Sequence, residues 1–284
     1  MILEWSKYKL DLSRKTHIMG ILNVTPDSFS DGGAFFDRDA AIERGFRLVE
    51  DGADIIDIGG ESTRPGSEAP PIEEELRRTI PVIEALAKKL PIPISIDTYK
   101  SAIARRALDA GASIVNDISG LRFDPEMPKI VADYNVPLVI MHIRGTPKNM
   151  QVNPVYDALI PEIMDYLREG IRLAVEAGVR EESIILDPGI GFGKTFEHNL
   201  EILGNLGEFS RLGKPLLVGP SRKAFIGKVL AGAPPSDRVE GTAAAVAIAI
   251  LNGAHIVRVH DVKEMARVAK VADAIKSGII RESP

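Results

Sequence analysis

Cysteine is absent from this chain of 284 residues. The chain therefore has no disulfide framework and no thiolate metal site. Long apolar runs are also missing, since the longest, around Ala243–Leu251, is too short to cross a bilayer. The first residues, Met1–Leu12, mix charged with apolar side chains and show no signal-peptide core or cleavage site. From these absences we expect a cytoplasmic protein that has no membrane partner.

An excess of basic residues is missing as well. Thirty-five lysines and arginines face 40 aspartates and glutamates, which gives a formal net charge of −5. A mildly acidic chain without a basic face argues against nucleic acid as a partner. Apolar residues, by contrast, make up 45% of the chain, and the mean hydropathy is +0.03. Because no linker or low-complexity tract divides it, we predict a single domain over residues 1–284.

Short apolar runs alternate with longer amphipathic segments along the chain. The short runs are rich in β-branched residues and nearly continuous, as in parallel strands that are buried on both faces. The predicted strands are His17–Leu22, Asp54–Ile58, Pro93–Ile96, Ser113–Asn116, Pro137–Met141, Ser183–Leu186, Pro215–Val218 and His255–Val259. Helical patterns lie between them, for example at Asp39–Asp51, Ile72–Lys89, Tyr99–Ala110, Ile160–Ala177 and Val239–Asn252. This alternation predicts an α/β fold, a (β/α)8 TIM barrel.

The main alternative is an open, doubly wound sheet, whose reversal of strand order a sequence cannot reveal. Eight βα units in this length, with polar residues after nearly every strand, favour the barrel. Residues Ile2–Lys15 precede the first barrel strand. We expect them to form a short N-terminal hairpin that closes the bottom of the barrel.

Polar side chains follow the predicted strands, and in barrel enzymes the active site lies at these C-terminal strand ends. Asp97, Asn116 and Asp187 can offer acceptors and donors to a flat, nitrogen-rich heterocycle. Ser221 precedes a predicted helix start, which favours a phosphate or carboxylate. A second set of side chains is cationic and suits an oxyanion such as a diphosphate. This set comprises Arg64, Lys223, Arg258 and His260.

Each of these features also has an ordinary structural interpretation. Asp97 could be only a helix N-cap, and Asp187 could belong only to a turn. His142 fits a satisfied histidine near the core as well as it fits a ligand. The run Glu73–Glu75 is typical of a solvated first helical turn, which the helix dipole favours. The gathering of so many polar groups at one ring of strand ends is the stronger signal.

Eight sequence blocks carry the most specific signal, and they run from the first predicted strand to the last helix. They are MGILNVTPDSFSDGG (Met19–Gly33), GADIIDIGGESTRPG (Gly52–Gly66), ISIDTYK (Ile94–Lys100), IVNDISG (Ile114–Gly120), LVIMHIRGTPKNMQ (Leu138–Gln151), ILDPGIGFGK (Ile185–Lys194), GPSRKAFIG (Gly219–Gly227) and RVHDVKEM (Arg258–Met265). Together they resemble the dihydropteroate synthases, a family of pterin-binding enzymes.

The resemblance implies a transferase of folate biosynthesis. Enzymes of this family join 6-hydroxymethyl-7,8-dihydropterin diphosphate to p-aminobenzoate, giving 7,8-dihydropteroate and pyrophosphate. The resemblance also implies Mg²⁺ as cofactor, a homodimer, and inhibition by sulfonamides.

The same resemblance implies roles for individual residues. The pterin ring would be held by Asp97, Asn116, Met141, Asp187, Phe192 and Lys223. The diphosphate would be bound by Asn23, Thr63, Arg64, Arg258 and His260, with Asn23 as the protein contact of Mg²⁺. The p-aminobenzoate pocket would be built from Phe29, Thr63, Arg64, Pro65 and Ser221. The expected catalytic residues are Asp97, Lys223 and Arg258.

Two other functions remain as alternatives. One is a pterin-binding methyltransferase that passes a methyl group from methyltetrahydrofolate to a corrinoid protein, and such a barrel needs no diphosphate clamp. The other is a non-catalytic pterin-binding paralogue, which should have lost part of the loop or cationic set. The presence of that whole set favours the synthase. One departure from the family pattern is Arg144, where glutamine is common, and it would add positive charge near the mouth.

Overall fold

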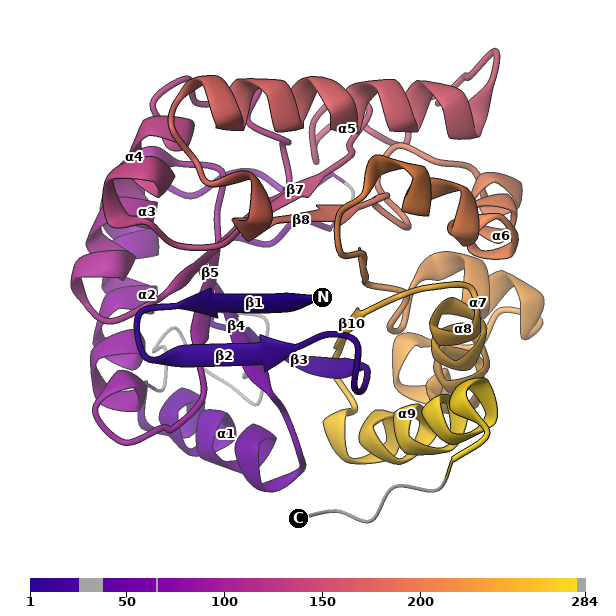
Figure 1. The fold of residues 1–284 in the computed structure, drawn as a ribbon, viewed down its shortest axis with the longest axis horizontal. Coiled ribbons are helices and arrows are strands. Elements are labelled where there is room, and N and C mark those ends of the chain that lie inside the picture. The colour runs from indigo at the N-terminus through magenta and orange to yellow at the C-terminus, as the bar shows by residue number, and fades with distance from the viewer. Residues whose placement is uncertain (26–37, 65, 280–284) are drawn as a thin grey trace.

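Eight parallel strands form a barrel at the centre of the computed structural model, which describes residues 1–25, 38–64 and 66–279 (Figure 1). The strands are β3 (His17–Asn23), β4 (Ile55–Gly59), β5 (Ile94–Asp97), β6 (Ile114–Asp117), β7 (Leu138–Met141), β8 (Ile184–Asp187), β9 (Leu217–Val218) and β10 (Ile256–Val259). Leu186 of β8 forms a parallel bridge with Leu216, just before β9, and this bridge closes the ring. The closure rules out the open sheet and confirms the predicted barrel.

Helices alternate with the strands and surround the barrel (Figure 1). They are α1 (Arg38–Glu50), α2 (Ile72–Ala87), α3 (Ser101–Asp109), α4 (Met127–Tyr134), α5 (Leu159–Glu176), α6 (Phe196–Gly204), α7 (Ala224–Val229), α8 (Val239–Leu251) and α9 (Val262–Ser277), with short 3₁₀ turns at η2 (Glu181–Ser183), η3 (Leu206–Leu212) and η4 (Pro235–Asp237). The predicted strands and helices are all present, with ends within two residues of those expected. Within the described ranges, no helix has the length and apolar character needed to cross a membrane.

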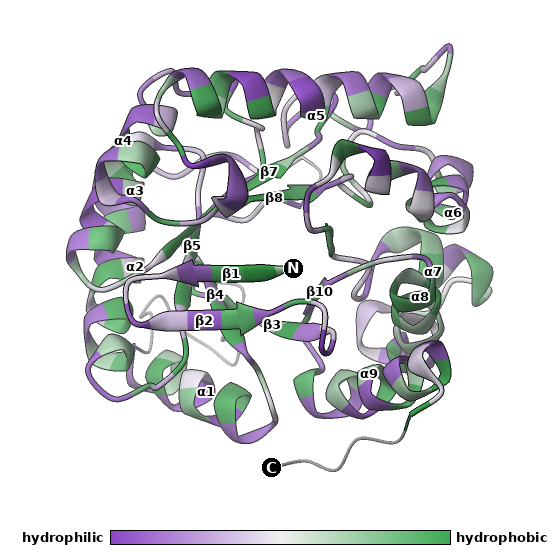
Figure 2. Cartoon of the chain, viewed as in Figure 1, coloured by the Kyte–Doolittle hydropathy of each residue, from purple (hydrophilic) through white to green (hydrophobic). Residues whose placement is uncertain are grey.

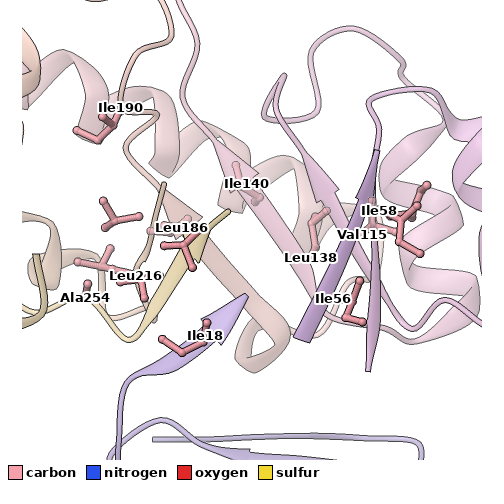
Figure 3. Packing of buried hydrophobic residues seen from close by; sticks show 14 of the residues in the cluster. Ile18, Ile56, Ile58, Val115, Leu138, Ile140, Leu186, Ile190, Leu216 and Ala254 are labelled. Carbon is pink, nitrogen blue, oxygen red and sulfur yellow. The ribbon is translucent and has the colours of Figure 1, made fainter. Parts of the chain in front are cut away.

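Alternation along each strand divides its side chains between two apolar layers. The outer layer lies between the strands and the helices and includes Ile56, Val115 and Ile140 (Figure 3). Figure 2 shows hydrophobic and hydrophilic residues interleaved around the outer helices, as expected of helices with one face on the strands. The residues between those of the outer layer face the barrel interior, and there the polar site is built.

The N-terminal hairpin closes one end of the barrel, as predicted. Strands β1 (Ile2–Trp5) and β2 (Tyr8–Asp11) pair antiparallel and lie across the barrel in Figure 1. Their buried side chains pack against the first inward-facing residues of the barrel strands. This inner cluster consists of Leu3, Trp5, Leu10, Leu12, Met19, Ile55, Ile114, Val139, Ile185, Leu217 and Ile256.

Candidate active site

Polar side chains replace apolar ones in the barrel interior two residues beyond the inner cluster. Asp57 follows Ile55 by two positions on β4, and Arg258 follows Ile256 by two on β10. Residues two apart on a strand point to the same side, so both side chains enter the barrel. On β5 and β6 the corresponding inward residues near the strand ends are Asp97 and Asn116, which are register partners. The strand periodicity thus places an apolar floor below a polar mouth.

Arg258 joins two carboxylates of different strands in the centre of this mouth. Its Nε donates to Asp57 Oδ2 and its Nη2 donates to Asp97 Oδ2, each at 2.6 Å. The Asn116 amide also donates to Asp57 Oδ2, at 3.1 Å. A guanidinium has five N–H donors, and these contacts use two of them. Arg258 therefore keeps donors for an anion while it is held in place by the barrel wall.

Two carboxylates facing one guanidinium leave an uncompensated negative charge, and burial makes that charge costly. Burial raises the pKa of Asp97 to about 7, and the nearby charge of Asp57 adds to this, against the opposing effect of Arg258. Near neutral pH the Asp97 carboxyl therefore exists in both protonation states. A group of this kind stabilises positive charge on a bound molecule more strongly than a solvated carboxylate would.

Asp187, at the end of β8, lies on another side of the mouth. Its Oδ1 accepts the Gly189 N–H at 2.7 Å, and burial raises its pKa to about 6. Lys223 lies nearby, with its Nζ 4.1 Å from the centre of the Phe192 ring. The pKa of Lys223 is lowered to about 8. Burial is the main cause and the charge of Arg258 adds to it, whereas the carboxylates of Asp187 and Asp97 act in the opposite direction. Asp187 thus forms the turn that its sequence suggested and also faces a cation.

An apolar wall accompanies these charges. Met141 and Phe192 belong to a small buried cluster at the strand ends, separate from both larger cores, with Tyr99 and Phe123 packed against it. The other buried members of this cluster are Ile118, Ile143 and Met150. A flat heterocycle could stack on this wall while its polar edge meets the carboxylates.

Ser221 and His260, which follow β9 and β10, form a hydrogen-bonded pair. The Ser221 Oγ lies 3.0 Å from His260 Nδ1 and accepts the His260 backbone N–H at 3.2 Å. Burial lowers the pKa of His260 to about 3, and the Arg258 charge adds to the effect. The lowered pKa favours a neutral His260 over the cationic one that the sequence suggested. A neutral imidazole that accepts the Ser221 hydroxyl proton keeps one N–H, on Nε2, for an anion.

The remaining predicted site residues lie at the ends of β3 and β4. Asn23 is the register partner of Gly59, and Gly59 is the partner of Asp97, so Asn23 lies two strands from that carboxylate. Thr63 is half-buried and Arg64 is exposed. Phe29 and Pro65 lie outside the described residues. Of the p-aminobenzoate set, Thr63 and Arg64 are thus the more exposed described residues, whereas Ser221 is buried beside His260.

Several local interpretations are decided by these contacts. Asp97 is no N-cap, because the cap position of α3 is Lys100 and the Asp97 carboxylate binds Arg258. His142 is a satisfied buried histidine, with its Nδ1 2.8 Å from Lys194 Nζ. Arg144 adds no free charge at the mouth, because it pairs with Glu162 at 2.9 Å.

Two parts of the buried polar structure were not found from the sequence. Asp57 lies inside an apolar run, and a single charged residue within a buried strand was the feature that could have indicated a buried ion pair. Glu75 was expected to be solvated, and this was wrong, because it is fully buried against Lys100. The helix-start pattern suggested solvent because it says nothing of a partner on another element.

A divalent cation has few protein ligands available in the described residues. They contain no group of three or more histidine, cysteine, aspartate or glutamate side chains that could hold a metal ion. Asn23 offers one amide oxygen, a hard ligand of the kind that Mg²⁺ accepts when phosphates supply others. This donor set fits a cation that arrives with a diphosphate.

The closed barrel and its acid-and-cation mouth agree with the match of the sequence to known families. The family described as "Pterin binding enzyme" matches residues 19–260, which run from β3 to the end of β10. The chain belongs to this family of pterin-binding enzymes.

Within that family, the relatives that the chain resembles are dihydropteroate synthases. The dihydropteroate synthase of Synechocystis is 54% identical over 265 residues, which cover 93% of this chain and 92% of the relative. The structure of the Yersinia pestis enzyme with a sulfonamide drug is 44% identical, with a TM-score of 0.92, over 98% of this chain and 100% of that one. The Xanthomonas albilineans enzyme with 4-aminobenzoic acid is 45% identical, with a TM-score of 0.89, over 95% and 96% of the two chains. The predicted synthase activity, a transferase reaction of folate biosynthesis, is thereby confirmed, while the roles of single residues stay predictions.

Proposed function

We propose that this chain condenses 6-hydroxymethyl-7,8-dihydropterin diphosphate with p-aminobenzoate at the mouth of the barrel. The observation that carries the proposal is the buried Asp57–Arg258–Asp97 network, with Asp187 and Lys223 beside it. Carboxylates suited to a nitrogen heterocycle and cations suited to a diphosphate meet there at one end of the barrel.

The pterin ring is proposed to bind between the apolar wall and the carboxylates. Met141 and Phe192 would cover its faces, and Lys223 would lie at its edge, over Phe192. The ring N–H groups would donate hydrogen bonds to the carboxylates of Asp97 and Asp187. Asn116 would complete this set with a donor and an acceptor.

The chemical step needs stabilisation of two developing charges. When the C–O bond to the diphosphate breaks, the pterin methylene becomes a delocalised cation, which the Asp97 carboxylate stabilises. The leaving pyrophosphate gains negative charge, which the free N–H groups of Arg258 offset. The arylamine is neutral at pH 7, so it attacks the methylene without a strong base. After the C–N bond forms, the resulting arylammonium gives one proton to solvent water.

The diphosphate is proposed to bind Asn23, Thr63, Arg64, Arg258 and His260. Mg²⁺ would be held by the Asn23 amide oxygen and by the diphosphate, and would neutralise charge on the leaving group. His260 would contribute its Nε2–H as a neutral donor.

The p-aminobenzoate pocket is proposed to form at the rim. Ser221 would face the carboxylate of this substrate, and Thr63 and Arg64 would line the opposite side with Phe29 and Pro65. Two related enzymes have been seen with a sulfonamide and with 4-aminobenzoic acid. We therefore expect sulfonamides to compete with p-aminobenzoate here, with inhibition relieved as p-aminobenzoate is raised.

A homodimer is proposed from an apolar face on α8 and α9. These two helices contact each other and expose Ile248, Leu251, Val271 and Ile275, the last two by 62% and 68%. An exposed apolar patch of this kind marks an interface between proteins. We also place the enzyme in the cytoplasm, where a diphosphate substrate and Mg²⁺ are available.

The proposed reaction is tested by pyrophosphate release from the purified chain, given dihydropterin diphosphate and Mg²⁺, with and without p-aminobenzoate. Release that depends on p-aminobenzoate and yields dihydropteroate is the expected result. Tight pterin binding without product would instead support the non-catalytic paralogue.

A further inference from the structure

One buried ammonium group lies beneath the segment that joins β4 to α2. Lys100 Nζ donates to Glu61 Oε2 and to Glu75 Oε2, each at 2.7 Å, and to the Pro70 carbonyl at 3.2 Å. An ammonium has three N–H donors, so these three acceptors satisfy it completely. The Lys100 side chain is 14% exposed, and those of Glu61 and Glu75 are 7% and 0% exposed.

The acceptors of Lys100 include residues at both ends of the segment that joins β4 to α2. Glu61 follows β4 and begins the segment, whereas Pro70 ends it just before α2. Glu61 is fixed further, because the Tyr99 hydroxyl donates to its Oε1 at 2.9 Å. A single side chain on the β5–α3 connection therefore ties the beginning of the segment to its end.

The middle of the segment is held by fewer hydrogen bonds to the rest of the protein than its two ends are. The Ser67 Oγ lies within hydrogen-bond distance of the Ser62 carbonyl and, at 2.8 Å, of the Arg64 carbonyl, and its single O–H donates to one or is shared between them. The Gly66 N–H donates to the Pro147 carbonyl at 3.1 Å. These contacts fix backbone within the segment or against one neighbouring loop. The placement of the segment therefore relies on the contacts of its two ends, together with this one loop contact.

Burial and the two carboxylates act in opposite directions on the pKa of Lys100. Burial lowers the pKa of Lys100, but its hydrogen bonds to Glu61 and Glu75 outweigh burial, so the pKa is raised overall. Burial raises the pKa of Glu75, against the effect of Lys100. A buried ion pair of this geometry is costly to break on one side, because the remaining partner stays charged in a poor solvent.

We propose that Lys100 is a positioning residue for the second substrate, and that by tying Glu61 to Pro70 it orients Thr63 and Arg64 toward p-aminobenzoate. The inference rests on the proposed function, in which Thr63 and Arg64 form part of that substrate's pocket. Lys100 itself touches neither substrate in this scheme.

The two carboxylates on Lys100 provide a matched pair of variants. Glu61 lies at the beginning of the segment, whereas Glu75 belongs to α2. Glu75 also accepts a hydrogen bond of 3.1 Å from the hydroxyl of Thr98, the residue that follows Asp97. Glu61→Gln and Glu75→Gln each remove one charge and leave Lys100 with one carboxylate. In both variants one lysine therefore still faces one carboxylate. They differ in whether the beginning of the segment loses its ionic contact with Lys100.

Steady-state kinetics of both variants should separate the two substrates. Glu61→Gln is expected to raise the KM for p-aminobenzoate about fivefold, with the KM for the pterin diphosphate and kcat within about twofold of wild type. Glu75→Gln is expected to leave the KM for p-aminobenzoate unchanged. Lys100→Arg, which keeps the charge, should lie between wild type and Glu61→Gln. Equal effects of both glutamine variants, or a parallel rise of both KM values, would overturn the proposal.

Hydrogen–deuterium exchange of the peptide covering residues 61–71 gives a readout that needs no turnover. Faster exchange in Glu61→Gln than in Glu75→Gln is expected, with peptides from α5 unchanged as an internal reference. Identical exchange in the two variants would show that Lys100 does not hold the segment. If the wild-type protein made no dihydropteroate, the proposed reaction would be wrong. The exchange experiment would still test whether Lys100 holds the segment in place.

Discussion

The two ends of the barrel are built from the same eight strands but have opposite chemistry. At the N-terminal end the inward residues are apolar, and the hairpin covers them with its own buried side chains, Leu3 and Trp5 among these. At the C-terminal end the inward residues include Asp57, Asp97 and Arg258, and Arg258 donates to both carboxylates. The same periodicity of two thus serves a packed floor and a reactive mouth.

The contrast indicates how the fold separates stability from function. Apolar burial at the floor contributes free energy of folding without restricting the residues at the mouth. At the mouth, buried charges cost free energy, and shifted pKa values reveal that cost. Substitutions at the floor should therefore change stability alone, and substitutions at the mouth should change turnover first.

The largest effect is expected at the floor. Leu3→Ala should lower the free energy of unfolding by about 3 kcal/mol, because it opens a cavity beneath the barrel. Ile2→Ala, on the exposed face of the same strand, should change it by less than about 0.5 kcal/mol. Urea unfolding followed by the fluorescence of Trp5, the only tryptophan of the chain, measures both. A fall in kcat of folded Leu3→Ala would break the separation of the two ends.

At the mouth, Asp97→Asn should lower kcat by more than about tenfold, because the developing cation loses its counter-charge. The fold should survive, since Arg258 keeps Asp57 as a partner. Asp117→Asn provides the contrast, because Asp117 accepts the backbone N–H groups of Ser119 and Leu121 at 2.7 and 3.0 Å. That variant should lose stability and keep its kcat. Unchanged turnover in Asp97→Asn would remove Asp97 from the catalytic set.

The pH profile should report the mouth as well. Asp97 must be ionised to act, and its pKa is raised to about 7, so kcat/KM for the pterin diphosphate should fall about tenfold per pH unit below that value. Lys223 must be protonated, and its pKa is lowered to about 8, so a second fall is expected above that value. Lys223→Arg should move the alkaline limb upward. A flat profile between pH 6 and 9 would contradict these assignments.

The sequence predicted the strands closely because both faces of a barrel strand are buried. An apolar run such as that of β7 is then continuous, and its ends are marked by polar residues. Asn116 and Asp187 could be expected at the mouth on that basis. The site was predictable where a residue's role follows from its place at a strand end.

Contacts between distant elements could not be predicted in the same way. Asp57 is buried because Arg258, 201 positions later, neutralises it. Glu75 is buried because Lys100 reaches it from the β5–α3 connection. The neutral state of His260 depends on burial and on the neighbouring Arg258. In each case the outcome is set by a partner that local periodicity does not specify.

The smallest effect is expected for Arg144→Gln, at the position where the chain departs from the family pattern. Arg144 lies on the β7–α5 connection near the mouth, but its guanidinium is 4.3 Å from the centre of the Tyr156 ring and is bound to Glu162. Because this charge is already paired on a half-exposed surface, the KM for the pterin diphosphate should change by less than about twofold. Measuring that KM at low and high salt checks the argument. A larger rise at low salt would show that the Arg144 charge acts on the anionic substrate after all, and would extend the reactive mouth outward to this loop.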